Sequence, residues 1–139
     1  MQALQKPKNK RKEEIMRFAI VDDELFARNT LKKLLAGYEA EIYEADNGYK
    51  GYLLYKNIKP DIIFVDLLMP GEISGEWLIE KILNYDPNAK IVVCSGRNKA
   101  KMLKYKAYGC EETLPKPIKY NELINTVDRI LKKTYVKAQ

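Results

Sequence analysis

The chain has 139 residues, of which 46% are hydrophobic and 32% charged, as in a single globular domain that buries a core. It contains no histidine and only two cysteines, which excludes imidazole chemistry and a disulfide framework. No apolar stretch approaches the ~20 residues of a membrane span, and no secretory signal precedes the first strand, so a cytoplasmic location is expected. The net charge of +6 lies mostly in residues 1–17, which argues against a nucleic-acid partner.

The expected organisation is a single domain with two short extensions. Residues 1–15 are basic and polar and lack apolar periodicity, so they are expected to form a disordered leader. Residues 16–133 are expected to form the domain, and residues 134–139 a C-terminal stub.

Apolar runs typical of strands alternate with segments of helical periodicity along this domain. In chain order the expected elements are strand 17–21, helix 23–36, strand 41–45, helix 48–57, strand 61–66, helix 75–85, strand 90–94, helix 98–108, strand 111–114 and helix 119–133. Gly51 costs a helix interior ~1 kcal/mol relative to alanine, so helix 48–57 is expected to be the least stable. This alternation predicts an α/β fold with a doubly wound, five-stranded parallel sheet and helices on both faces.

Polar side chains follow four of the strands where each strand ends. Asp22 and Asp23 follow the first strand, Asp66 ends the third, Ser95 follows the fourth and Lys116 follows the fifth. The carboxyl ends of parallel strands share one edge of the sheet, where ligands collect in open α/β folds. These five side chains are therefore expected to meet at one site.

Three neighbouring carboxylates repel one another unless one takes a proton or a cation lies between them. Without histidine or paired cysteines, an oxygen-rich site favours a hard cation, Mg²⁺ or alternatively Mn²⁺. With the metal on the acidic pair, Asp66 could attack phosphorus and form an aspartyl phosphate. Ser95 would then donate a hydrogen bond to a phosphoryl oxygen, and Lys116 would add positive charge.

Each residue also has an ordinary structural explanation. Asp23 or Glu24 could cap a helix, Ser95 could belong to a simple turn, and Lys116 could be a solvated side chain. Their shared position at the ends of successive strands favours the common site.

The motifs resemble those of the response-regulator receiver domain of two-component signalling, of the single-domain chemotaxis-regulator type. The matching segments are residues 21–24, residues 61–66 with Met69-Pro70, Ser95-Gly96, and Lys116-Pro117. The resemblance covers about residues 16–133. It implies a flavodoxin-like sheet with strand order 2-1-3-4-5.

The resemblance also implies a role for each matching residue. Asp66 would be the phosphoacceptor and Asp23 a direct metal ligand, with Asp22 assisting partly through water. The backbone carbonyl of Leu68 would complete the metal site. Ser95 would be the switch hydroxyl and Lys116 the charge partner of the phosphoryl group.

By the same resemblance, the phosphoryl donor is a histidine kinase or a histidine phosphotransfer protein of a phosphorelay. A downstream protein would bind the face formed by the fourth helix, the fifth strand and the fifth helix. The chain would signal through this association and would not be an enzyme, although it assists its own phosphorylation and dephosphorylation.

Three positions depart from the family pattern. Thr113 stands three residues before the lysine where an aromatic residue is usual, so a different activation readout is expected. Leu68 cannot orient attacking water, which predicts slow self-dephosphorylation. Residues 71–75 form a loop that looks one residue longer than usual.

Two alternatives to the phosphoacceptor function remain open. Thr113 and Leu68 favour a phosphorylation-independent interaction domain of the same fold, while the complete set of site residues opposes it. An aspartate-nucleophile phosphatase would need a second acid two residues after Asp66, so it ranks last. The basic fourth helix is either a solvated face or a docking surface for an acidic partner; its lysines are Lys99, Lys101, Lys104 and Lys106.

Overall fold

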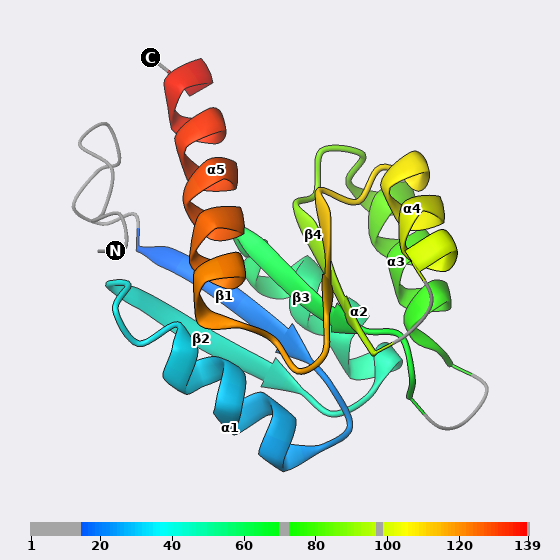
Figure 1. Ribbon diagram of the computed structural model, residues 1–139. Coiled ribbons are helices and arrows are strands. Elements are labelled where there is room, and N and C mark those ends of the chain that lie inside the picture. Colours follow the sequence, from blue (N-terminus) through cyan, green and yellow to red (C-terminus); the bar gives the residue numbers. More distant parts are fainter. Residues whose placement is uncertain (1–14, 70–72, 97–98, 139) are drawn as a thin grey trace.

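The computed structural model describes residues 15–69, 73–96 and 99–138, and these form one parallel sheet covered by helices (Figure 1). The strand order is β2-β1-β3-β4-β5, and every pair of neighbouring strands is parallel, which confirms the predicted fold. The strands are β1 (Met16–Val21), β2 (Ala40–Ala45), β3 (Ile62–Asp66), β4 (Ile91–Ser95) and β5 (Glu112–Pro115). The helices are α1 (Leu25–Leu34), α2 (Gly48–Ile58), α3 (Gly75–Tyr85), α4 (Lys99–Tyr108) and α5 (Tyr120–Ala138).

The sheet separates two hydrophobic cores. Alternate residues of a strand point to opposite faces, so Phe18 and Phe64 pack with α1 and α5, while Val21 and Val65 pack with α2, α3 and α4. Figure 1 shows α1 and α5 on one face of the sheet and the other three helices on the opposite face. Strands β3 and β4 are buried along their whole length, which explains their nearly continuous apolar sequence.

The predicted elements all occur, and most boundaries agree within two residues. The largest difference is at the C-terminus, where α5 continues through Ala138 although residues 134–139 were expected to form a stub. No glycine or proline follows Lys133, so nothing in the local sequence ends the helix there. Residues 1–14 of the expected leader, the first residue of the expected helix 98–108 and part of the loop 71–75 lie outside the described residues.

Two glycines are required by close packing around α2 and α3. A Cβ atom on Gly51 would touch both Val21 and Leu78, so glycine lets α2 lie close to β1 and α3. A Cβ atom on Gly75 would collide with the backbone carbonyl oxygen of Asp66. The first turn of α3 therefore rests directly against the end of β3.

Among the described residues, no helix combines the length and the apolar character needed to cross a membrane.

Candidate functional site

The candidate site lies at the carboxyl edge of the sheet, where the strand register brings several loop residues level with one another. The pairs at this edge are Val21 with Val65, Asp66 with Cys94, and Ser95 with Pro115. The residues that directly follow β1 and β5 therefore lie beside the last residues of β3 and β4.

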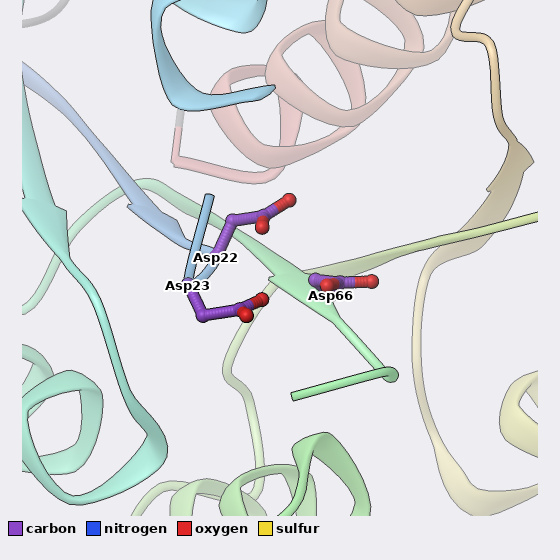
Figure 2. Close-up of side chains that lie close together, drawn as sticks. All are labelled: Asp22, Asp23 and Asp66. Atoms are coloured by element: carbon purple, nitrogen blue, oxygen red, sulfur yellow. The ribbon is translucent and has the colours of Figure 1, made fainter. Parts of the chain in front are cut away.

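Three carboxylates gather at this edge. Ligand oxygens of Asp22, Asp23 and Asp66 all lie within 4.8 Å of one another, and Figure 2 shows the three side chains together between the ends of β1 and β3. Asp22 and Asp66 are each only 5% exposed, so little solvent separates the charges. The structure thus brings together the acids that the sequence predicted to meet.

Lys116 balances part of this negative charge. Its Nζ donates a hydrogen bond to Asp22 Oδ2 at 2.9 Å and lies 3.4 Å from Asp66 Oδ1. Burial alone would lower the pKa of Lys116, but the hydrogen bond to Asp22 and the charge of Asp66 outweigh it, so the pKa is raised. Lys116 therefore stays protonated and holds the two acids together.

The pKa of Asp66 is raised above its ordinary value, chiefly by burial and then by the negative charge of Asp22. Lys116 and the backbone N–H of Leu68, which donates to Asp66 Oδ1 at 3.3 Å, act in the opposite direction. Because the net shift is upward, one lysine does not fully compensate the buried acids. A further cation would relieve the remaining repulsion.

Two oxygens at this edge are buried without a hydrogen-bond partner among the described residues. They are Asp23 Oδ1 and Ser95 Oγ. Buried polar atoms are normally satisfied, so each of these oxygens is available to an atom from outside the chain. An all-oxygen donor set with a vacant carboxylate oxygen fits a hard divalent cation, and a vacant hydroxyl nearby fits an anionic oxygen.

The two oxygens of Asp22 are already used within the protein. Oδ2 accepts from Lys116, and Oδ1 accepts from the backbone N–H of Glu24 at 3.0 Å. Glu24 occupies the N-cap position of α1, yet its side chain makes no capping hydrogen bond. The capping explanation offered for Glu24 is therefore wrong, and Asp22 supports the backbone at the start of α1.

The sequence analysis missed one residue that positions this loop. Arg28 donates from Nη1 to the carbonyl oxygen of Asp22 at 2.8 Å and from Nε to Glu44 at 3.0 Å. It links the acidic loop to β2. Its place one turn into the helix after Asp22 is the signal that could have identified it.

A cavity beside the acids was also missed. It has a volume of about 310 Å³, lies between α1 and the segment after β5, and opens onto Asp66 and Lys116. Phe26 and Ile118 line it together with other apolar side chains, and Phe26 is 81% exposed. An exposed phenylalanine off the core-facing side of a helix is the sequence signal for such a surface.

Comparison with known proteins agrees with this geometry. The family model described as the response regulator receiver domain matches residues 18–128. The chain is 37% identical over 119 residues to the chemotaxis protein CheY of Thermotoga maritima, a match covering 84% of this chain and 98% of that protein.

Solved structures show the same fold. The receiver domain of a LuxO repressor protein from Vibrio parahaemolyticus superposes with a TM-score of 0.82 at 21% identity, covering 90% of this chain and 96% of that one. A CheX–CheY–BeF₃–Mg²⁺ complex from Borrelia burgdorferi gives a TM-score of 0.76 at 21% identity, covering 84% and 89%. With the family model spanning most of the sequence, this chain belongs to the response regulator receiver domain family.

Proposed function

We propose that the chain is a phosphoacceptor module that takes a phosphoryl group onto Asp66 and signals by phosphorylation-dependent association with another protein. The observation that supports this most directly is the meeting of Asp22, Asp23 and Asp66 within 4.8 Å, with Lys116 beside two of them. Receiver domains of this family are signalling modules, so the chain is not proposed to be an enzyme acting on a separate substrate.

The proposed metal ligands are Asp22, Asp23, Asp66 and the backbone carbonyl of Leu68, and the proposed ion is Mg²⁺, with Mn²⁺ as a substitute. Asp23 is the best candidate for direct contact because its Oδ1 is buried without a partner among the described residues. Asp22, whose oxygens already accept from Lys116 and Glu24, would assist through water. Bound there, the ion would offset the charge of the phosphoryl oxygens.

Three side chains of the chain itself would carry out the phosphoryl transfer. An oxygen of Asp66 attacks phosphorus as the bond from phosphorus to the donor histidine nitrogen breaks, and the imidazole leaves with that electron pair. Lys116 faces the negative charge that collects on the phosphoryl oxygens. Ser95, whose hydroxyl has no partner in the described part of the chain, would donate to one of these oxygens.

The proposed phosphoryl donor is a histidine kinase or a histidine phosphotransfer protein, and it must cover the surface around Asp66. The apolar cavity between α1 and the segment after β5 opens onto Asp66, and the exposed Phe26 lines this cavity. These features suit contact with an apolar helix surface. They make this side of the site the best candidate for the donor interface.

The proposed downstream surface is the face of α4, β5 and α5. Leu103 is 68% exposed and Tyr108 60% exposed on α4, beside Lys104, which suits a partner with apolar and acidic groups. The side chains of Lys99 and Lys101 lie outside the described residues. With Thr113 in place of the usual aromatic residue, changes at Ser95 would reach this face through backbone and helix shifts.

The direct test is incubation with acetyl phosphate and Mg²⁺. We expect intact mass spectrometry to show the addition of one phosphoryl group. Trp77 fluorescence should also change, because Trp77 lies in the first turn of α3, and Gly75 of that turn packs against the backbone of Asp66. Beryllofluoride with Mg²⁺ should give the same fluorescence change without covalent addition. An unchanged mass under all donor concentrations would favour the alternative, an interaction domain that works without phosphorylation.

The lifetime of the phosphorylated protein tests the role of Leu68. Its side chain is apolar and 53% exposed beside Asp66, so it cannot hold water for in-line attack. We expect slow self-dephosphorylation and at least about tenfold faster hydrolysis in Leu68→Asn, since an amide can hydrogen-bond a water molecule and orient it for attack. Leu53→Asn, on an exposed side of α2, is the matched control. A half-life of seconds for the unaltered protein would contradict this prediction.

A further inference from the structure

The outer surface of α2 and α3 carries aromatic and lysine side chains in two facing rows. We call this surface the α2–α3 face; its members are Tyr49, Tyr52, Leu53, Lys56, Trp77, Lys81 and Tyr85. On α3 the members recur every four residues, which places them on one side of the helix. Tyr49 is 53% exposed, Leu53 38% and Tyr85 44%. Large apolar side chains are therefore concentrated here on the protein surface.

The rings and ammonium groups form a continuous line across the two helices. Lys56 Nζ lies 4.7 Å from the centroid of the Tyr52 ring, and the Tyr52 and Trp77 rings pack edge to face at 6.0 Å. Lys81 Nζ lies 5.7 Å from the centroid of the Trp77 ring. Tyr85 packs against Tyr52 at 6.4 Å, also edge to face. The face is thus held in shape by its own lateral contacts.

The positive charge of this line is not balanced locally. Within the described residues, neither Lys56 nor Lys81 forms an ion pair with a carboxylate, whereas neighbouring Lys50 pairs with Asp46 at 3.4 Å. Asp86, at the end of α3, accepts a hydrogen bond from Tyr55 Oη at 2.7 Å. Asp46 and Asp86 thus have partners other than Lys56 and Lys81.

The two sides of α3 differ in character. Glu76 and Glu80 line a cavity on the side of α4, together with Tyr105 and Tyr108. Trp77 packs against Tyr52 of α2, and Lys81 lies over the Trp77 ring. The members of the α2–α3 face are therefore apolar, aromatic or positive, and none of them is a carboxylate.

We propose that the α2–α3 face is a docking surface for an acidic protein segment that also carries apolar side chains. The two lysines lie at opposite ends of the line of rings, so a segment laid across them can meet an ammonium group at each end and an aromatic surface between. Charged groups arranged in this way favour a partner of opposite charge. The surface is separate from the face of α4, β5 and α5, and binding to it does not require phosphorylation of Asp66.

Two other occupants fit the same observations less well. A second copy of the chain docked through this face would bring its lysines against those of the first, and like charges across an interface are costly. A single-stranded nucleic acid would need free ring faces for stacking, but Lys56 and Lys81 already cover those of Tyr52 and Trp77. Both occupants remain as outcomes of the experiment.

The experiment is an NMR titration of the full chain with a synthetic amphipathic peptide of alternating glutamate and leucine. We expect chemical-shift changes confined to α2 and α3, including the Trp77 indole N–H, and weaker binding at higher salt. The variant Lys56→Glu with Lys81→Glu should bind about tenfold more weakly or worse. The matched control is Lys33→Glu with Lys132→Glu, which changes the net charge equally at exposed sites on α1 and α5 and should bind as the unaltered chain does.

Four results of the binding measurements would overturn the proposal, as would self-association through this face. They are no perturbation of this face at millimolar peptide, equal weakening in the control variant, a perturbation centred on α4, and tighter lysine-dependent binding of single-stranded DNA. Self-association that Lys56→Glu with Lys81→Glu changes would instead assign the face to a second copy. Phosphorylation by acetyl phosphate in the same variant is measured in parallel, so failure here is distinguishable from failure of the proposed phosphoacceptor function.

Discussion

Asp66→Asn is expected to abolish phosphorylation of the chain by acetyl phosphate and Mg²⁺. Asparagine keeps the size of the side chain but replaces the attacking carboxylate oxygen with an amide, which is a far weaker nucleophile. Intact mass spectrometry should show one added phosphoryl group on the unaltered chain and none on the variant. The reason lies in the geometry: of the three clustered acids, Asp66 is the one that ends a fully buried strand.

The matched control is Asp46→Asn, which removes an exposed carboxylate from the loop after β2 at the same edge of the sheet. This variant should be phosphorylated like the unaltered chain. Phosphorylation that persists in Asp66→Asn would move the acceptor to another residue and refute the proposed role.

Asp66→Asn should also be more stable than the unaltered chain when metal is removed. Burial and the charge of Asp22 raise the pKa of Asp66 above its ordinary value of 3.8, so the ionised form is disfavoured in the folded state. This cost is fully present above the raised pKa and disappears as the pH falls below 3.8. Thermal unfolding in a chelator should therefore show a higher Tm for Asp66→Asn at pH 7 than for the unaltered chain, with the difference vanishing in acid. Equal Tm values for Asp66→Asn and the unaltered chain at pH 7 would show that the ionised Asp66 does not destabilise the folded state.

The second large effect is expected from Asp23→Asn, which should weaken Mg²⁺ binding by more than about 100-fold. Even residues that only support metal ligands typically contribute about 10- to 100-fold to affinity, and Asp23 is proposed to contact the ion directly. Its Oδ1 is buried without a partner among the described residues, so the carboxylate is already desolvated and available. Isothermal titration calorimetry and Trp77 fluorescence would both measure the loss.

Phosphorylation should fall together with the metal affinity of Asp23→Asn and should recover in part at high Mg²⁺. Asp46→Asn again serves as the control, and a chelator should reduce phosphorylation of the unaltered chain to the level of the variant. Unchanged Mg²⁺ affinity in Asp23→Asn would show that the ion, if it binds, uses other oxygens.

Most of the fold could be predicted from the sequence because the local and global signals agree. The runs at residues 18–21, 62–65 and 91–94 are apolar throughout, as expected of strands buried on both faces, and turn residues separate them from periodic helices. The strand order 2-1-3-4-5 came from the resemblance to a family rather than from periodicity. The end of α5 was not predictable from the same signals, because no residue near Lys133 stops a helix.

The candidate site could be predicted as a set of residues but not as a set of contacts. The proximity of these residues could be predicted because each lies at the carboxyl end of a strand; they are Asp22, Asp23, Asp66 and Lys116. The different roles of Asp22 and Asp23 came from the resemblance to the family and not from the residues themselves, because they depend on which oxygens other groups already occupy. Asp22 accepts from Lys116 and from Glu24, while Asp23 retains a free oxygen, and only the folded chain distinguishes them.

Features that depend on tertiary neighbours were missed for the same reason. Phe26 has the sequence character of a core residue, yet it is 81% exposed beside the cavity next to Asp66. The packing of Tyr52 on α2 against Trp77 and Tyr85 of the neighbouring helix was likewise not predicted. Sequence spacing within one helix carries no information about what the next helix presents to it.

Lys116, which follows β5, contacts both Asp22 and Asp66, so the site depends on the last strand of the sheet as well as on β1 and β3. A protease cut that released the last strand would carry the lysine away and leave two enclosed negative charges with no counterweight in the remaining piece. A fragment without the last strand would therefore lack a complete site. Loss of the last strand is therefore expected to abolish the proposed phosphorylation altogether, without leaving a partly active fragment.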